Sequence, residues 1–183
     1  GPIADISDAT PMRNGEVGEV IARSPHISAR YYEAPDDMAD NKIADGDTLW
    51  HRLGDTGWLD DDGRLWVCGR RSHRVVTADR TYFPLCAEPV FNSHRDVARS
   101  ALIGPRRPGD DSTSVAVVIE LEPSARPRQS AVERELRDLA EAREATRGID
   151  TFFFIERLPV DKRHNAKIDR PGLARQAGEG TLT

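Results

Sequence analysis

Several features that mark other protein classes are scarce in this 183-residue sequence. It has two cysteines, Cys68 and Cys86, and neither has a second cysteine or a histidine at the spacing of metal ligands. No stretch approaches the roughly 20 apolar residues that a membrane helix needs, and no basic start followed by an apolar segment opens the chain. We therefore expect free buried thiols, no metal site built by the chain, no membrane span and a cytoplasmic location.

Aromatic residues are few as well, at 6%, beside 38% apolar and 31% charged residues. Such a composition predicts a thin core, with part of the surface available to a partner. The net charge of −5 argues against nucleic acid as that partner. Basic residues nevertheless outnumber acidic ones by four to one in segment 70–80 and by six to two in segment 157–175. Two basic segments in an acidic chain suit a compact anion such as a nucleotide phosphate.

Short strands and turns are predicted for the first part of the chain. Alternating apolar residues after a turn glycine indicate a strand at 18–23, and Asp62-Gly63 is a hairpin signal ahead of a strand at 65–68. Another strand is predicted at 75–77. The polar tetrapeptide at 69–72, which begins with glycine, is the best candidate for a domain boundary.

The second part predicts strands alternating with helices. A helix at 130–147 has the clearest pattern, because Ser130 and Glu133 form a capping box and Gly148 can end the helix. One apolar stripe runs along it through Val132, Leu136, Leu139 and Ala140. The other predicted elements are a short helix at 87–94, strands at 97–104, 114–122 and 151–159, and a terminal helix begun by Asp169 and Pro171. This order predicts an α+β fold.

Two residues of the first part carry functional groups that suit a nucleotide. Gly54 is predicted to place Asp55 on a tight turn, where its carboxylate could accept hydrogen bonds from both hydroxyls of a ribose. Arg70 follows a predicted strand, and its forked guanidinium suits a sugar or phosphate oxygen. A plain turn and an ordinary exposed arginine explain the same residues.

The basic stretch LPVDKRHNAKIDRPGL, residues 158–173, contains the strongest candidate for catalysis. Lys167 sits in a loop flanked by prolines, from which an ammonium group could reach a phosphate or a carboxylate under attack. Arg163 and His164 are candidate phosphate contacts. A solvated basic loop is the alternative for all three. His164 has no serine or cysteine nucleophile motif beside it, so no catalytic triad is predicted.

Four motifs in this order and spacing resemble the C-terminal part of acyl-adenylate-forming enzymes. They are GEVGEVIARSP at 15–25, YYEAPD at 31–36, WHRLGDTGWLDDDGRLWVCGRR at 50–71 and LPVDKRHNAKI at 158–168. The superfamily contains acyl-CoA synthetases, luciferases and nonribosomal adenylation domains. WHRLGD, CGRRSHRV and PVDKRHNAKI are most similar to the β-lactone synthetases of olefin and β-lactone biosynthesis. Such enzymes use ATP and Mg²⁺ to adenylate a β-hydroxy fatty acid, whose own hydroxyl then displaces AMP to close a lactone.

The resemblance also implies a domain division and a role for each candidate residue. Residues 1–71 would be the β-rich end of a large adenylating domain, and 72–183 a small mobile lid with a short sheet flanked by helices. Asp55 would bind the ribose of ATP, Arg70 would assist at the ribose or phosphate, and Ser72 would be the hinge. Lys167 would bridge the carboxylate and the α-phosphate during adenylation. The large domain's phosphate loop and acyl pocket are missing, so the chain is expected to be an inactive fragment by itself.

Two alternatives to a β-lactone synthetase stay open at this point. The first is a long-chain fatty acyl-CoA synthetase. Against it, Asp79 and Arg80 stand where relatives carry glycines, and their side chains would crowd a pantetheine tunnel. The second is a non-catalytic module that keeps the lid fold and docks to other pathway enzymes. A nucleotide-binding regulator has little support, because no phosphate loop is present.

Overall fold

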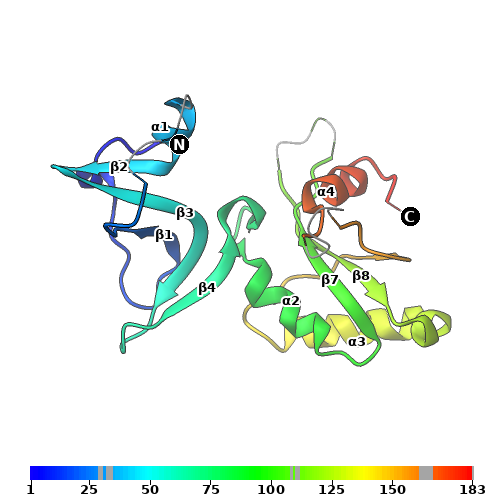
Figure 1. Cartoon of the computed structure of the whole chain (residues 1–183). Helices are drawn as coiled ribbons and strands as arrows, with labels where there is room; N and C mark the ends of the chain where they lie inside the picture. The colour runs from blue at the N-terminus through cyan, green and yellow to red at the C-terminus, as the bar shows by residue number, and fades with distance from the viewer. Residues whose placement is uncertain (29–30, 32–34, 108, 110–111, 161–166, 183) are drawn as a thin grey trace. The chain divides into compact units, whose positions relative to one another are not determined.

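The computed structural model describes residues 1–28, 31, 35–107, 109, 112–160 and 167–182. The chain divides into two compact units, Gly1–Ser72 and His73–Thr183, and each is described by itself (Figure 1). Strands and helices are mixed along the chain, which confirms the α+β class. No helix in the described part is long and apolar enough to cross a membrane.

The first unit is built around one long strand. Its strands are β1 (Gly18–Ala22), β2 (Lys42–Asp45), β3 (Thr48–Leu59) and β4 (Leu65–Arg70), with helix α1 (Pro35–Asn41) and the short 3-10 helices η1 (Ile6–Asp8) and η2 (Arg71–His73). These four strands pair antiparallel, with β3 as the partner of the other three, and Asp5 adds a parallel bridge to Ala44 of β2. The predicted strand at 18–23 is confirmed, as is the hairpin, in which Gly63 turns with a φ of 76° between β3 and β4.

The turn predicted at Asp55 is wrong, because Asp55 lies within β3. Gly54 does have a positive φ of 72°, so it bends the chain as only glycine readily does. Strand pairing holds the backbone extended on both sides of that bend. His51 pairs with β1 and β2, and Gly57 pairs with β1 and β4. Long-range pairing therefore overrides the local turn preference of the two glycines.

The second unit has a three-stranded sheet with helices on both faces. Strand β8 (Ala116–Leu121) is central, antiparallel to β7 (Val97–Ile103) and parallel to β9 (Phe152–Ile155). A separate hairpin joins β5 (Val75–Val76) and β6 (Thr81–Tyr82). The helices are α2 (Pro84–Asn92), α3 (Gln129–Glu141) and α4 (Arg170–Gly178), with the 3-10 helix η3 (Pro123–Arg128) before α3.

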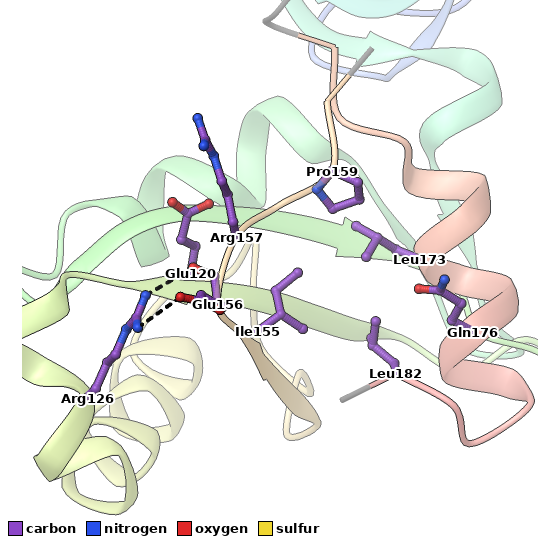
Figure 2. Close-up of a pocket in the computed structure, with 9 residues that line it drawn as sticks. All are labelled: Glu120, Arg126, Ile155, Glu156, Arg157, Pro159, Leu173, Gln176 and Leu182. Atoms are coloured by element: carbon purple, nitrogen blue, oxygen red, sulfur yellow. Dashed lines mark hydrogen bonds and ion pairs between the residues drawn. The ribbon is translucent and has the colours of Figure 1, made fainter. Parts of the chain in front are cut away.

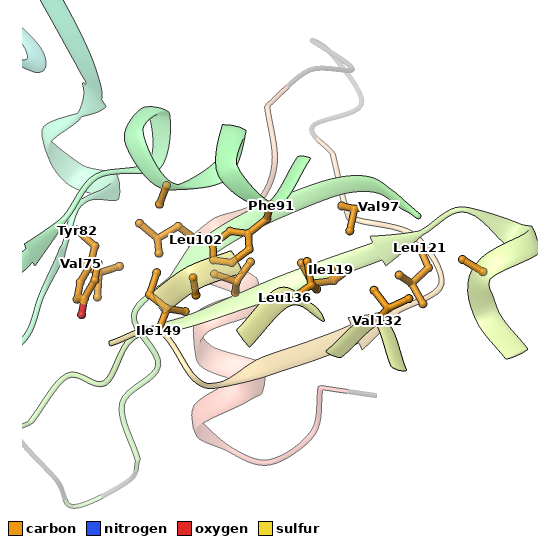
Figure 3. Close-up of a cluster of buried hydrophobic side chains, with 14 residues drawn as sticks. Val75, Tyr82, Phe91, Val97, Leu102, Ile119, Leu121, Val132, Leu136 and Ile149 are labelled. Atoms are coloured by element: carbon orange, nitrogen blue, oxygen red, sulfur yellow. The ribbon is translucent and has the colours of Figure 1, made fainter. Parts of the chain in front are cut away.

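Alternation along the strands separates two apolar clusters. Leu102, Val117 and Ile119 face the cluster that contains buried residues of α2 and α3, as Figure 3 shows. Ala101, Ile103, Ala116 and Val118 face the other cluster, which contains Leu173 of α4. Successive strand residues point to opposite faces, so each face of the sheet receives its own helical layer. These pairings confirm the strands predicted at 97–104 and 114–122 to within two residues at each end, whereas the strand predicted at 151–159 ends at Ile155.

Helix α3 is present, but its predicted ends are wrong. Val132, Leu136 and Ala140 are fully buried, as the apolar stripe predicts. The helix ends at Glu141, and Gly148 follows only after a turn-rich segment. No side-chain hydrogen bond caps its start, so the capping box is absent. Because η3 leads directly into α3, the chain is already helical before Ser130 and leaves its hydroxyl no free helix end to cap.

Candidate functional site

Lys167 is the first described residue after 161–166, and it is exposed. The residue after it, Ile168, forms an antiparallel bridge with Val160. The amide of Asp169 donates a 3.0 Å hydrogen bond to the carbonyl of Pro159. Arg163 and His164 belong to residues 161–166, which lie outside the described residues, so their predicted phosphate contacts stay predictions.

Helix α4 begins directly after this bridge. The Asp169 carboxylate accepts a 3.0 Å hydrogen bond from the amide of Gly172, and Pro171 occupies the first turn. This confirms the terminal helix predicted from the two residues. Arg170, the first residue of α4, forms an ion pair with Glu88 of α2 at 2.8 Å. Lys167 therefore lies three residues before Arg170, whose ion pair with Glu88 attaches the start of α4 to α2.

In the first unit, Asp55 and Arg70 are brought together. They are directly paired residues of β3 and β4, and the Arg70 Nε lies 3.4 Å from the Asp55 Oδ1. Arg70 also donates a 2.8 Å hydrogen bond to the carbonyl of Leu53. The Asp55 side chain is one-third exposed, at 33%, so a ligand could reach its carboxylate. Ser72, the predicted hinge, is exposed in η2 and is the last residue of the first unit.

Another charged side chain in the first unit, Arg52, is structural. It is 4% exposed and donates to both carboxylate oxygens of Glu19, at 3.0 and 2.7 Å. Its other terminal nitrogen donates to the carbonyls of Gly1 and Asp40. The hydrogen bonds to Glu19 raise the pKa of Arg52. This pair joins β1 to β3, and Arg52 belongs to the same motif as Asp55.

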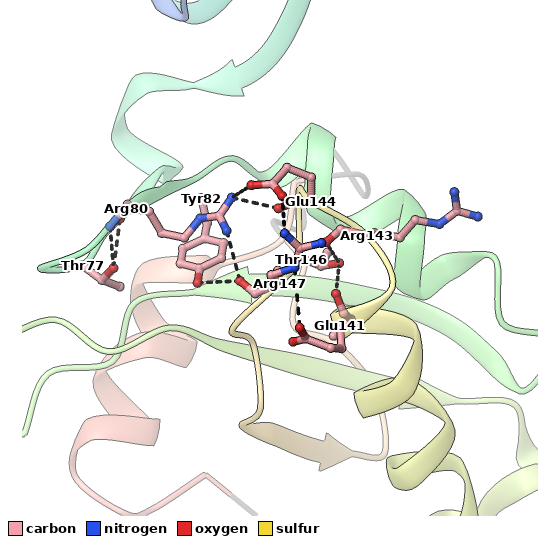
Figure 4. Close-up of polar contacts among 9 residues, drawn as sticks. Thr77, Arg80, Tyr82, Glu141, Arg143, Glu144, Thr146 and Arg147 are labelled. Atoms are coloured by element: carbon pink, nitrogen blue, oxygen red, sulfur yellow. Dashed lines mark hydrogen bonds and ion pairs between the residues drawn. The ribbon is translucent and has the colours of Figure 1, made fainter.

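The β5–β6 hairpin is fastened to the segment after α3 by Arg80 (Figure 4). The Arg80 guanidinium donates to the carbonyls of Glu144 and Arg147, at 2.8 and 3.3 Å, and lies 5.0 Å from the centre of the Tyr82 ring. The Tyr82 hydroxyl donates to the same Arg147 carbonyl at 3.0 Å. Within the turn, the Thr77 hydroxyl and amide both bond to the carbonyl of Arg80. Arg80 therefore holds this hairpin in place.

A groove of about 680 Å³ opens between the end of β9 and helix α4 (Figure 2). Ile155, Leu173 and Leu182 contribute apolar surface, and Arg126 and Glu156 pair beside them at 3.4 Å. Lys167 does not line this groove. We therefore do not place the adenylation chemistry in it.

One group of described residues has the spacing of metal ligands, namely His94, Asp96 and Glu135, whose ligand atoms lie within 4.8 Å of one another. Arg128 already bonds to both carboxylates, and His94 Nε2 lies 2.8 Å from Glu135. The hydrogen bond from His94 is the main cause that lowers the pKa of Glu135. A guanidinium among the ligands does not suit a divalent cation, so this group does not fit Mg²⁺.

Comparison with known proteins relates the chain to ligases. No protein-family model matches it. Olefin β-lactone synthetases from Stenotrophomonas maltophilia (strain K279a) and Xanthomonas campestris pv. campestris are 40% and 39% identical over 178 residues, or 94% of this chain. A 2-succinylbenzoate–CoA ligase from Geobacillus kaustophilus is 29% identical and covers 84% of it. The chain belongs to the acyl-adenylate-forming superfamily. This confirms the resemblance seen in the four motifs.

Solved structures of this superfamily share the fold. The amide bond synthetase McbA from Marinactinospora thermotolerans matches with a TM-score of 0.73 and 25% identity, over 94% of this chain and 33% of its own. O-succinylbenzoate coenzyme A synthetase (MenE) from Bacillus subtilis, in complex with AMP, matches with a TM-score of 0.69 and 26% identity, over 88% and 31%. The chain spans about a third of the length of the curated relatives it matches, 32% for both β-lactone synthetases.

Sequence reasoning missed the ion pair between Glu88 and Arg170, three residues after Lys167. Glu88 lies in a short helix with Pro89, and Arg170 is one of many basic residues in its segment. The roles of both are set by a contact between residues far apart in the chain. A glutamate that faces the core side of a helix was the available signal, because buried carboxylates are nearly always paired.

Proposed function

We propose that this chain is the C-terminal part of an ATP-dependent ligase that adenylates a long-chain β-hydroxy fatty acid and closes it to a β-lactone. The observation that carries the proposal is 40% identity to an olefin β-lactone synthetase over 94% of the chain. An exposed lysine, Lys167, fits the catalytic role. The first unit would complete the large domain, and the second would be a lid that turns about Ser72.

Two bond exchanges make up the proposed reaction. A substrate carboxylate oxygen attacks the α-phosphorus of ATP, a new P–O bond forms, and the bond to the β-phosphate breaks to release pyrophosphate. The substrate's β-hydroxyl oxygen then attacks the acyl carbon and loses its proton, while the bond from that carbon to the AMP oxygen breaks. Lys167 acts in the first exchange, where its positive charge offsets the repulsion between two anions.

Asp55 and Arg70 have a binding role in this proposal. The Asp55 carboxylate accepts hydrogen bonds from the ribose hydroxyls, and Arg70, bonded to Asp55 and to the Leu53 carbonyl, keeps that carboxylate oriented. Mg²⁺ would supply charge neutralisation at the triphosphate. Mg²⁺ is usually held by one or two carboxylates together with substrate phosphates and water, so it would be bound here mainly through the triphosphate.

An acyl-CoA synthetase is the second candidate, favoured by the similarity to CoA ligases. The hairpin argues for the lactone instead. Arg80 fills the side of the turn toward the segment after α3 and is tied there by two carbonyls. A pantetheine arm that needs the glycine-lined backbone of relatives would have to displace this side chain.

The proposal is tested on the full-length ligase with ATP and a β-hydroxy fatty acid, with and without coenzyme A. We expect pyrophosphate release, and a β-lactone in the mass spectrum whether or not coenzyme A is present. Lys167→Ala should slow pyrophosphate release about 10²- to 10³-fold, the range for losing a group that stabilises developing charge. Arg175→Ala is the control: it removes an exposed cation of α4, and it should have little effect on pyrophosphate release. Thioester as the product rejects the lactone, and wild-type adenylation by Lys167→Ala rejects the catalytic role.

A further inference from the structure

The ion pair between Glu88 and Arg170 is the most enclosed one in the described part of the second unit. Their side chains are 11% and 15% exposed. The Nη2 atom of Arg170 lies 2.8 and 2.9 Å from the two carboxylate oxygens of Glu88, and the Nε atom of Arg170 lies 3.2 Å from one of them. This forked geometry fixes the direction of the arginine as well as its distance.

Glu88 has a further partner that makes the pair a junction of three elements. Its Oε1 accepts a 2.8 Å hydrogen bond from the amide of Leu102 in β7. Strand β7 is at the edge of the sheet, so Glu88 satisfies a backbone donor that has no strand beside it. The pair thus joins α2, the sheet edge and the first residue of α4. Burying an ion pair adds little stability by itself, so the geometry it imposes is the more informative property.

That junction lies three residues from Lys167. The intervening residues are also held, because Ile168 bridges to Val160 and the Asp169 amide bonds to Pro159. The segment that carries Lys167 is therefore attached to the rest of the unit at two successive points, the bridge at Ile168 and the ion pair of Arg170. Releasing Arg170 would remove the attachment to α2 and the sheet edge, and would leave the bridge and the packing of Ile168 and Leu173 on the second apolar cluster.

We propose that Glu88 and Arg170 are positioning residues that hold the backbone of Lys167 at the place from which its ammonium group acts. This inference rests on the proposed function, in which Lys167 is catalytic. Its physical basis is that a charge placed in advance stabilises a transition state without reorganisation, whereas a loosely held charge does not. Neither residue would touch the substrate.

The test compares Glu88→Gln with Asp96→Asn in the full-length ligase. Both variants replace a carboxylate that pairs with an arginine of the second unit. The partner of Asp96, Arg128, precedes α3, which packs on the sheet face opposite α4. Two quantities are measured: the rate of pyrophosphate release, and hydrogen exchange at the amides of Asp169 and Leu173, which donate to the carbonyls of Pro159 and Asp169.

We expect Glu88→Gln to speed exchange at both amides and to slow adenylation by about 10-fold or more, the scale expected for a misplaced catalytic group. Asp96→Asn should leave both measurements within about twofold of the wild type. Arg170→Lys, which keeps a cation and loses the fork, should fall between the wild type and Glu88→Gln. Addition of preformed acyl-adenylate should restore lactone formation in Glu88→Gln, because only the first bond exchange uses Lys167.

Exchange in Glu88→Gln that matches the wild type overturns the positioning role, and so does faster exchange with an unchanged rate. A slowed rate without faster exchange also overturns it, because the defect then arises elsewhere. Lys167→Ala is measured in parallel. If that variant adenylates normally, the catalytic role of Lys167 fails, a result distinguishable from the exchange outcome at Asp169 and Leu173.

Discussion

Replacing Arg52 with methionine should destabilise the first unit strongly, although the residue lies three positions from the proposed ribose ligand. Methionine keeps much of the side-chain volume and removes every donor. It would leave the Glu19 carboxylate, whose side chain is 19% exposed, without its bidentate partner. Breaking one side of a buried pair costs about 3–5 kcal/mol. Arg71 lies 3.7 Å from Glu19 and can compensate in part, so we expect about 3 kcal/mol, the low end of that range.

Tryptophan fluorescence is the assay, because all three tryptophans of the chain, Trp50, Trp58 and Trp66, lie in the first unit. A loss of about 3 kcal/mol corresponds to a fall of roughly 12–24 °C in the melting temperature of a unit this size. The control is Glu19→Leu combined with Arg52→Met, which removes both charges. That double variant should be more stable than Arg52→Met alone, since no charge is left unpaired. A single variant that loses under about 1 kcal/mol, or a double variant with additive losses, would refute the reasoning.

Three further predictions concern stability and ionisation. Gly57→Ala should cost about 1–3 kcal/mol in the same fluorescence melt, because the added Cβ would lie 2.7 Å from the carbonyl oxygen of Trp66; an unchanged melt would contradict this. Leu136→Ala, at a fully buried position of α3, should cost about 2–5 kcal/mol by circular dichroism, and a loss under about 1 kcal/mol would mean that the second unit collapses around the gap. His94→Gln should raise the pKa of Glu135 in an NMR titration, because the hydrogen bond from His94 lowers that pKa. In the wild type, the ionised Glu135 carboxylate therefore stabilises the fold at neutral pH. This stabilisation is lost as the pH falls through the lowered pKa of Glu135.

Local patterns predicted the elements whose signals lie within a few residues. The stripe through Leu136 has the period of a helix, and Asp62-Gly63 has the chemistry of a hairpin turn, so both survive in the structure. One failure occurs where distant partners decide. Gly54 and Gly57 favour a turn locally, yet β3 stays extended because strands on both edges bond to it. The Ser130 capping box fails for a local reason, because η3 runs directly into α3 before it.

The candidate site likewise has residues that the sequence could indicate and contacts that it could not. Asp55 and Arg70 could be chosen from residue type and motif, but not their pairing. The register of the hairpin alone would put Asp55 opposite Gly69, and a bulge between Thr56 and Gly57 shifts the partner to Arg70. The attachment of the segment that carries Lys167 could not be predicted, because it depends on Glu88, 82 residues from Arg170 in the chain. Arg80 was visible as a departure from the family's glycines. Its carbonyl partners became known only from the folded chain.

The parallel pairing of β8 with β9 has a consequence for the order in which the second unit folds. Antiparallel β7 and β8 can meet early, whereas β9 can join only after the connection from Leu121 to Phe152, which includes α3, has closed. The lysine segment follows β9 along the chain and attaches to elements that precede it. We therefore expect the end of this unit that carries Lys167 to be the last to consolidate during refolding, after a nucleus of α2, β7 and β8.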